Sequence, residues 1–181
     1  MASLVQRFTG RHPLFCNMAL YAGLYASGDL SRQTIMADRR LDWGSAARTA
    51  CVGCLAISPF NFAWYRVLDR LLKGRGAGVV MCKVACDQVI AGPVGLALFF
   101  VGTSILEKKT DIFHDLKANG LKTYMVGCVF WPTMQAVNFT VLPTKWRTPY
   151  VGFVSFIWCN VISFFKSQEI QPPIIAVDLQ A

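Results

Sequence analysis

The chain of 181 residues is 54% hydrophobic and 15% charged, whereas soluble domains are about 25% charged. This shortage of charge excludes an ordinary soluble surface, so the composition predicts an integral membrane protein in the lipid bilayer rather than a soluble enzyme. The formal net charge of +8 does not predict nucleic-acid binding, because the Lys and Arg residues lie between apolar runs rather than on one polar face.

Five runs without Asp, Glu, Lys or Arg follow one another along the chain. A transmembrane helix needs about 20 mostly apolar residues to cross about 30 Å of hydrocarbon, and these runs are apolar on all sides, as membrane helices are. The predicted fold is all-α, a multi-pass transmembrane helical bundle of four to five kinked helices. The number of spans stays open because the first and last runs are short. The runs cover residues 13–28, 49–65, 88–106, 123–144 and 148–165.

The same pattern divides the chain into three parts. We expect a basic N-terminal segment at residues 1–12, the transmembrane bundle at residues 13–166 and a loosely ordered C-terminal tail at residues 167–181. Between the third and fourth runs, apolar residues at helical spacing among charges predict a short interfacial helix within residues 110–119. Basic residues are shared equally between the two sides of a five-span bundle, so the positive-inside rule gives no orientation.

Small residues recur four positions apart within the runs, a spacing that lets two helix backbones approach closely in lipid. Such spacings also arise by chance, so each pair is weak evidence of packing. The pairs are Ala19/Gly23, Gly23/Ser27 and Ala91/Gly95.

Three prolines, Pro59, Pro93 and Pro132, lie inside apolar runs. Proline removes a helical hydrogen bond and kinks or interrupts the helix. Broken helices border the solute site in many transporters, although kinks that serve packing alone are commoner. These prolines are therefore helix-break candidates that point to a solute path or to packing.

The fourth run carries a polar face. Trp131, Gln135 and Asn138 are spaced i, i+4 and i+7, so they share one side of a helix. Amide groups are expensive in hydrocarbon, so Gln135 and Asn138 must face a neighbouring helix or a water-filled cavity. Two interpretations stay open, namely hydrogen bonding between helices and the lining of a polar pathway.

Charged residues near the ends of the runs are candidates for a latch. Lys83 and Asp87 are four residues apart, beside Gln88, and would form an ion pair at the membrane surface. Burial of this pair against Arg147 or Asp29 would instead make it a gate or a structural latch. Asp29 could equally mark an ordinary helix end.

The sequence offers no credible catalytic residue, metal site or cofactor site. Cys51 and Cys54 have the C-x-x-C spacing of redox proteins, but they begin an apolar run and lack the strand-to-helix setting of such motifs. His12 and His114 are not in zinc-type spacing. The seven cysteines lie mostly in or near apolar runs and imply no disulfide framework. Intramembrane thiol chemistry at Cys51 and Cys54 stays a third hypothesis.

A longer motif gives a resemblance to a known family. The signature of a eukaryotic family of small organelle membrane proteins resembles residues 131–139 (WPTMQAVNF), which are followed by Leu142-Pro143 and Arg147. This family comprises a peroxisomal membrane protein and the mitochondrial inner-membrane protein whose loss depletes mitochondrial DNA. Further matching residues are Gly28-Asp29, Gln33, Trp64-Tyr65, Leu68-Asp69, Lys83, Asp87-Gln88, Pro93, Trp158 and Ser163.

Finer pieces of the sequence resemble the paralogue group that is named as "like" the mitochondrial member. These pieces are residues 111–113, 115–117 and 146–148. The chain departs from the family in the second run, where the family's Gly-Pro and nearby His become Ser58-Pro59 and Asn61-Phe62. A function of the family that rests on that second-run site is therefore not carried over.

The resemblance implies a helical membrane protein, usually four-spanning, that lies in the peroxisomal membrane or, alternatively, in the mitochondrial inner membrane; the like-group favours the peroxisome. It also implies a weakly selective channel or pore that affects reactive-oxygen metabolism and metabolite homeostasis, without an enzymatic reaction. The alternative function is a non-conducting scaffold or regulator of antioxidant defence that acts through a partner. A homo-oligomer and unidentified small solutes stay open as partners.

Overall fold

The computed structural model describes residues 12–35, 41–74 and 76–170, with side chains described as far as residue 160. Every regular element in these residues is helical, so the all-α prediction is confirmed. The elements are α2 (Pro13–Ile35), α3 (Trp43–Val52), η1 (Gly53–Ile57), α4 (Ser58–Leu71), α5 (Ala77–Cys86), η2 (Asp87–Ala91), α6 (Gly92–Leu106), α7 (His114–Val141) and α8 (Thr144–Ile170).

These elements form five helical rods, because α3–η1–α4 and α5–η2–α6 are each continuous. Each predicted apolar run lies within one rod, apart from a few residues at run ends. Two rods, Trp43–Leu71 and Ala77–Leu106, are long and apolar enough to cross a membrane by length and composition. The other three rods, α2, α7 and α8, are longer than their apolar runs and include charged residues beyond the run ends.

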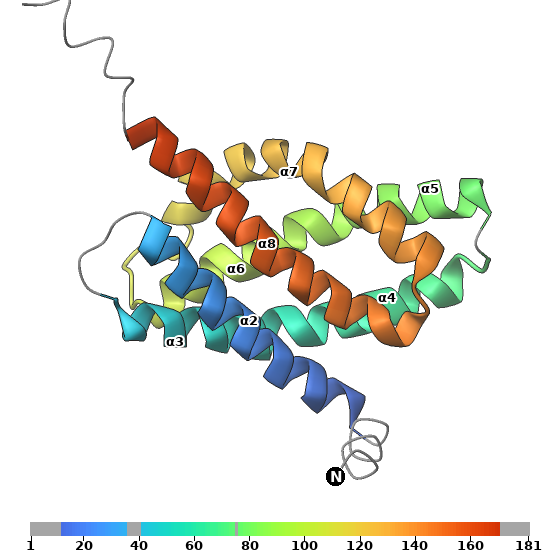
Figure 1. Cartoon of the computed structure of the whole chain (residues 1–181), viewed down its shortest axis with the longest axis horizontal. Helices are drawn as coiled ribbons and strands as arrows, with labels where there is room; N and C mark the ends of the chain where they lie inside the picture. Colours follow the sequence, from blue (N-terminus) through green and yellow to red (C-terminus); the bar gives the residue numbers. More distant parts are fainter. Residues whose placement is uncertain (1–11, 36–40, 75, 171–181) are drawn as a thin grey trace, which may run out of the picture.

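Successive rods run in opposite directions (Figure 1). The end of α4, the start of α5, the α7–α8 connection and the start of α2 lie at one end of the bundle, which we call the Asp69 end. The end of α2, the start of α3, the α6–α7 connection and the last turns of α8 lie at the other, which we call the Arg32 end.

A π-helical turn precedes two of the three prolines. Pro59 and Pro93 are the second residues of α4 and α6, directly after η1 and η2. A proline ring clashes with the carbonyl four residues earlier, and for both prolines that carbonyl lies in the π turn, at Leu55 and Val89. The wider turn accommodates the ring, and the rod continues. The structure shows no such turn at Pro132, which lies inside the single helix α7.

Helix α2 packs tightly against η1 and α8 at glycines. A Cβ atom on Gly53 would lie 2.6 Å from the Tyr25 ring, and a Cβ atom on Gly152 would lie 2.6 Å from the Tyr21 ring. Tyr21 is fully buried and donates to the backbone carbonyl of Thr148. The predicted pairs around Gly23 and Gly95 are wrong as sites of close approach, because a Cβ atom there would meet nothing within 4 Å.

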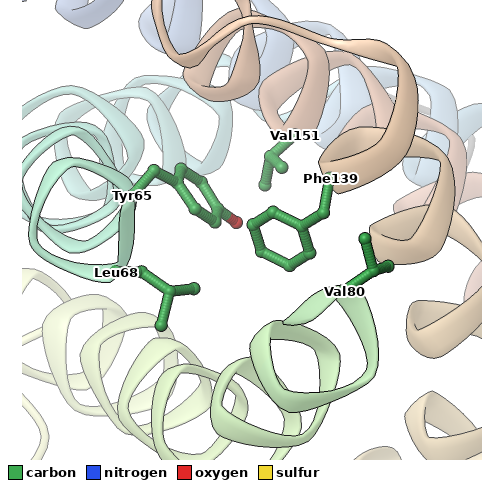
Figure 2. Packing of buried hydrophobic residues seen from close by; sticks show 5 residues of the cluster. All are labelled: Tyr65, Leu68, Val80, Phe139 and Val151. Atoms are coloured by element: carbon green, nitrogen blue, oxygen red, sulfur yellow. The ribbon is translucent and has the colours of Figure 1, made fainter. Parts of the chain in front are cut away.

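An apolar cluster packs the helices together toward the Asp69 end of the bundle. Figure 2 shows side chains from α4, α5, α7 and α8 that converge on the ring of Phe139, which is fully buried. The rings of Phe139 and Tyr65 meet edge to face, with centroids 6.0 Å apart. The cluster consists of Tyr65, Leu68, Val80, Phe139 and Val151.

Several predicted boundaries need correction. Asp29 does not end a helix, because α2 continues to Ile35. Residues 114–119 belong to α7 rather than to a separate interfacial helix. α8 continues through residues 167–170, where a tail was predicted. The rest of that tail and residues 1–11 of the basic segment lie outside the described residues.

Asp42 caps the start of α3 and is bound by Gln33 near the end of α2. The Asp42 side chain accepts a hydrogen bond from the Ser45 backbone N–H at 2.9 Å, which caps α3 and lowers the pKa of the Asp42 carboxyl. Gln33 of α2 then holds the same residue, accepting from its backbone N–H and donating to its carbonyl.

The glycine contacts predict a selective loss of stability. Gly152→Ala should destabilise the protein by about 1–3 kcal/mol, because its methyl group would overlap the buried Tyr21 ring. Gly23→Ala is the matched control, since open space surrounds that position and alanine favours a helix by up to about 1 kcal/mol. Thermal unfolding in detergent checks both variants, and equal melting temperatures would contradict the close α2–α8 contact.

Candidate functional site

A cavity of about 610 Å³ lies between the helices. Its walls come from α2, η1 and α4, η2 and α6, α7, and α8. Of the described residues that line it, those classed as exposed are Arg32, Asn119, Lys122 and Val126, so the cavity opens toward the Arg32 end. We call Arg32, Asn119 and Lys122 the mouth.

The inner end of the cavity is a hydrogen-bonded set that we call the Gln135 network. Asp87 accepts from Trp64 Nε1 at 2.9 Å and from Gln135 Nε2 at 2.7 Å. The second N–H of the same amide reaches the Tyr65 hydroxyl at 2.8 Å. Asn138 Nδ2 donates to Gln135 Oε1 at 2.7 Å. The network thus joins α4, η2 and α7 at the level of the cavity floor.

The predicted polar face of α7 is divided between two environments. Trp131 and Gln135 line the cavity, whereas Asn138 is fully buried and does not. Gln135 therefore takes part both in bonding between helices and in the cavity lining. Among the described side chains, Asn138 Oδ1 and Ser58 Oγ are buried polar atoms without a hydrogen-bond partner. Such atoms are rare in folded proteins.

The mouth is organised by a buried acid. Asp29 is 6% exposed, and its Oδ1 accepts from Arg32 Nε at 3.0 Å and Nη2 at 2.7 Å. Its Oδ2 accepts from Gln33 Nε2 at 2.7 Å. Asp29 is thus no part of a latch with Lys83, and it holds the Arg32 guanidinium at the rim of the cavity.

Two of the other predicted latch residues, Lys83 and Arg147, meet at an acid that the predicted site did not include. Lys83 does not pair with Asp87; its Nζ lies 2.7 Å from Asp69 Oδ1. Arg147 and Thr144 also bind the Asp69 carboxylate. We call these four residues the Asp69 cluster. The i, i+4 ion pair fails because Asp87 faces α4 and α7, where neutral donors satisfy it.

The Asp69 cluster holds two buried cations on one carboxylate. The side chains of Lys83 and Arg147 are each 3% exposed, and that of Asp69 is 17% exposed. The Phe139 ring lies beside both cations, with its centroid 5.0 Å from Arg147 Cζ and 5.9 Å from Lys83 Nζ. Cation–π attraction offsets part of the excess positive charge. A sequence signal existed for Asp69, since it is the sole acidic residue between Asp42 and Asp87.

Gln88 belongs to the cavity wall rather than to the latch. Its Nε2 donates to Cys128 Sγ at 3.3 Å, and its carbonyl accepts from the Tyr124 hydroxyl at 3.1 Å. Both partners lie on α7, so these contacts hold η2 against α7.

The described part of the chain contains no group of three or more His, Cys, Asp or Glu residues that could hold a metal ion. Cys51 and Cys54 are free thiols, the first exposed and the second half-buried. The cavity has charged and aromatic surfaces that can contact a solute.

The sequence is similar to that of known membrane proteins. A family described as "Mpv17 / PMP22 family" matches residues 104–163. The chain is 36% identical to the "Mpv17-like protein" of Bos taurus over 162 residues, which cover 90% of this chain and 82% of the relative. It is 34% identical to the "Mpv17-like protein" of Xenopus laevis, covering 94% and 84%. The "Mitochondrial inner membrane protein Mpv17" of Xenopus laevis is 29% identical, covering 88% and 93%. No solved structure gives a significant match.

The Asp69 cluster predicts an unequal response to two substitutions. Asp69→Asn should destabilise the protein by about 3–5 kcal/mol, because it leaves two buried cations without their anion. Lys83→Met should stay within about 1 kcal/mol of the wild type, because one cation and one anion then remain paired. Thermal and denaturant unfolding in detergent measure both effects.

The matched control is Asp111→Asn, which removes a carboxylate from an exposed ion pair with Lys117 and should change little. A Lys83→Met variant as unstable as Asp69→Asn would contradict the two-cation account.

Proposed function

Since the chain belongs to the Mpv17/PMP22 family of organelle membrane proteins, we propose that it is a multi-pass membrane protein that forms a weakly selective channel for small solutes. The observation that carries this proposal is the cavity, which reaches from the exposed mouth to the Gln135 network. Polar side chains at membrane depth are expensive unless they line a water-filled cavity or bind one another. Asp87 and Gln135 both line the cavity and form a hydrogen bond with each other.

The proposed arrangement in the bilayer has all five rods crossing it. The rods Trp43–Leu71 and Ala77–Leu106 carry the composition of a span along their length, and the other three would cross through their apolar runs. Large apolar side chains on four of the rods point outward, as lipid contact requires. Examples are Leu55 (67% exposed), Met81 (69%), Val89 (69%), Val129 (81%) and Phe153 (54%).

We place the closed gate of this channel at the Asp69 end. Neither the Asp69 cluster nor the Phe139 side chain lines the cavity, so a solute would have to part α4, α5 and α8 to pass. The unpartnered Asn138 Oδ1 and Ser58 Oγ support a second arrangement in which these atoms find partners.

The subcellular localisation is a further part of the proposal. The like-group resemblance favours the peroxisomal membrane, whereas the name of the Xenopus laevis relative supports the mitochondrial inner membrane. We retain the peroxisomal membrane as the proposed site, and imaging of the tagged chain against markers of both organelles decides between them. An effect on reactive-oxygen metabolism would follow from solute passage, without a catalytic reaction by this chain.

Conductance tests the channel directly. The purified full chain, reconstituted in planar bilayers, should conduct ions, and Gln135→Leu should lower the conductance several-fold because it replaces the amide of the cavity floor. Thr140→Val is the matched control on α7, since Thr140 is exposed and bonds only within its own helix among the described residues. Folded protein without any conductance would favour the scaffold function instead.

The gate makes a separate prediction. Lys83→Met removes the bond that ties α5 to Asp69 on α4, so this variant should stay open for longer and raise the mean current. Single-channel recording measures the open probability. An unchanged open probability would show that the Asp69 cluster is a structural contact and no gate.

A further inference from the structure

The distribution of charge along the cavity is uneven. Two basic residues, Arg32 from α2 and Lys122 from α7, lie at the mouth. Among the lining residues the acidic side chain is Asp87, at the inner end. A solute that enters the cavity therefore meets positive charge first and negative charge last, so its two ends are recognised by different chemistry.

The mouth suits an anion. Asp29 accepts two hydrogen bonds from Arg32, through Nε and Nη2, and a guanidinium carries five N–H groups. Arg32 can therefore bind a second anion while Asp29 keeps it in place. Lys122 adds a further positive charge from the opposite wall. A carboxylate or phosphate between them would contact both α2 and α7.

The walls require more than an inorganic ion. Aromatic rings line the middle of the cavity, with Phe99 and Phe100 on α6, Trp131 on α7 and Trp158 on α8. The centroids of the two indole rings are 6.0 Å apart. A volume of about 610 Å³ is in the range of sites for small organic molecules. Phosphate or chloride alone would leave these apolar walls without a partner.

The floor limits what the far end of the solute can be. Asp87 already accepts from Trp64 and Gln135, and a carboxylate has about four lone-pair sites, so it can accept another hydrogen bond. A hydroxyl or another neutral donor satisfies it. A second carboxylate would instead face Asp87 in a setting with little water, where like charges repel strongly.

We propose that the cavity binds an organic monoanion with an apolar body and a neutral or hydrogen-bond-donating far end. Its anionic group lies between Arg32 and Lys122, its body lies against Trp131 and Trp158, and its far end meets Asp87. This inference rests on the proposed function and names the solute class that the channel takes. The same chemistry occurs in water-soluble organic acids and in single-chain anionic lipids, so the experiment separates these sources.

The test uses three compounds that share one body. They are 3-(4-hydroxyphenyl)propionate, its amide, and the analogue in which a carboxylate replaces the phenol hydroxyl. Titration calorimetry with the full chain in phosphatidylcholine nanodiscs should show binding of the hydroxy acid. The amide lacks the anion, and the dicarboxylate places a second charge beside Asp87, so each should bind at least about tenfold more weakly.

Substitutions in the chain test which residues cause these differences in affinity. Arg32→Gln and Lys122→Gln should each weaken binding of the hydroxy acid about tenfold. Lys109→Gln should leave it unchanged, because Lys109 lies at the same end of the bundle but outside the cavity. Asp87→Asn should improve binding of the dicarboxylate. This gain of affinity cannot result from misfolding.

The source of the anion is decided by a second arm with lysophosphatidylglycerol, a single-chain lipid with one negative charge, as the probe. Dependence on Arg32 and Lys122 for the hydroxy acid supports an aqueous solute, and the same dependence for lysophosphatidylglycerol alone supports a lipid. Equal affinity for acid and amide, or no binding of either anion, overturns the proposal. Conductance that persists in that case would leave the channel intact and refute only the solute class.

Discussion

The side-chain amide of Gln135 uses all its hydrogen-bonding groups within the bundle. Its two N–H groups reach Tyr65 and Asp87, and its oxygen accepts from Asn138. A helix that moves away from Gln135 leaves these buried polar groups without their protein partners, which is expensive at membrane depth. The positions of α4, η2 and α7 depend on this amide, and the floor of the cavity lies where the three elements meet.

The two ends of the bundle treat positive charge differently. At the Arg32 end, the basic side chains of the mouth are exposed, and Asp29 binds one of them, Arg32. At the Asp69 end, Lys83 and Arg147 are buried and share one carboxylate. Burial makes the second arrangement sensitive to the loss of its anion. The chain thus has one end with exposed cations at the cavity mouth and one end where a buried charge cluster joins the helices.

The positions of the helices could be predicted well from the sequence, because charge-free runs mark them. The ends of the helices were predicted less well. Asp29 and Asp87 lie inside rods because Arg32, Gln33, Trp64 and Gln135 supply their partners. The polar face of α7 followed from spacing alone. Asp69 was not predicted as a site residue, since its partners come from α5 and from the α7–α8 junction, far away in sequence. The mouth was missed for the same reason, as only the fold brings Arg32 near Lys122.

A contiguous set of side chains connects the cavity floor with the closed end. Tyr65 and Asp69 are one turn apart on α4, so they lie on the same face. Tyr65 binds the floor through Gln135 and packs on the Phe139 ring, which in turn lies beside the guanidinium of Arg147. A solute bound at Asp87 would therefore act on the helix face that also carries the proposed gate. The floor and the proposed gate are neighbouring parts of one packed unit, so we expect a change in hydrogen bonding at Asp87 to alter the contacts of Asp69.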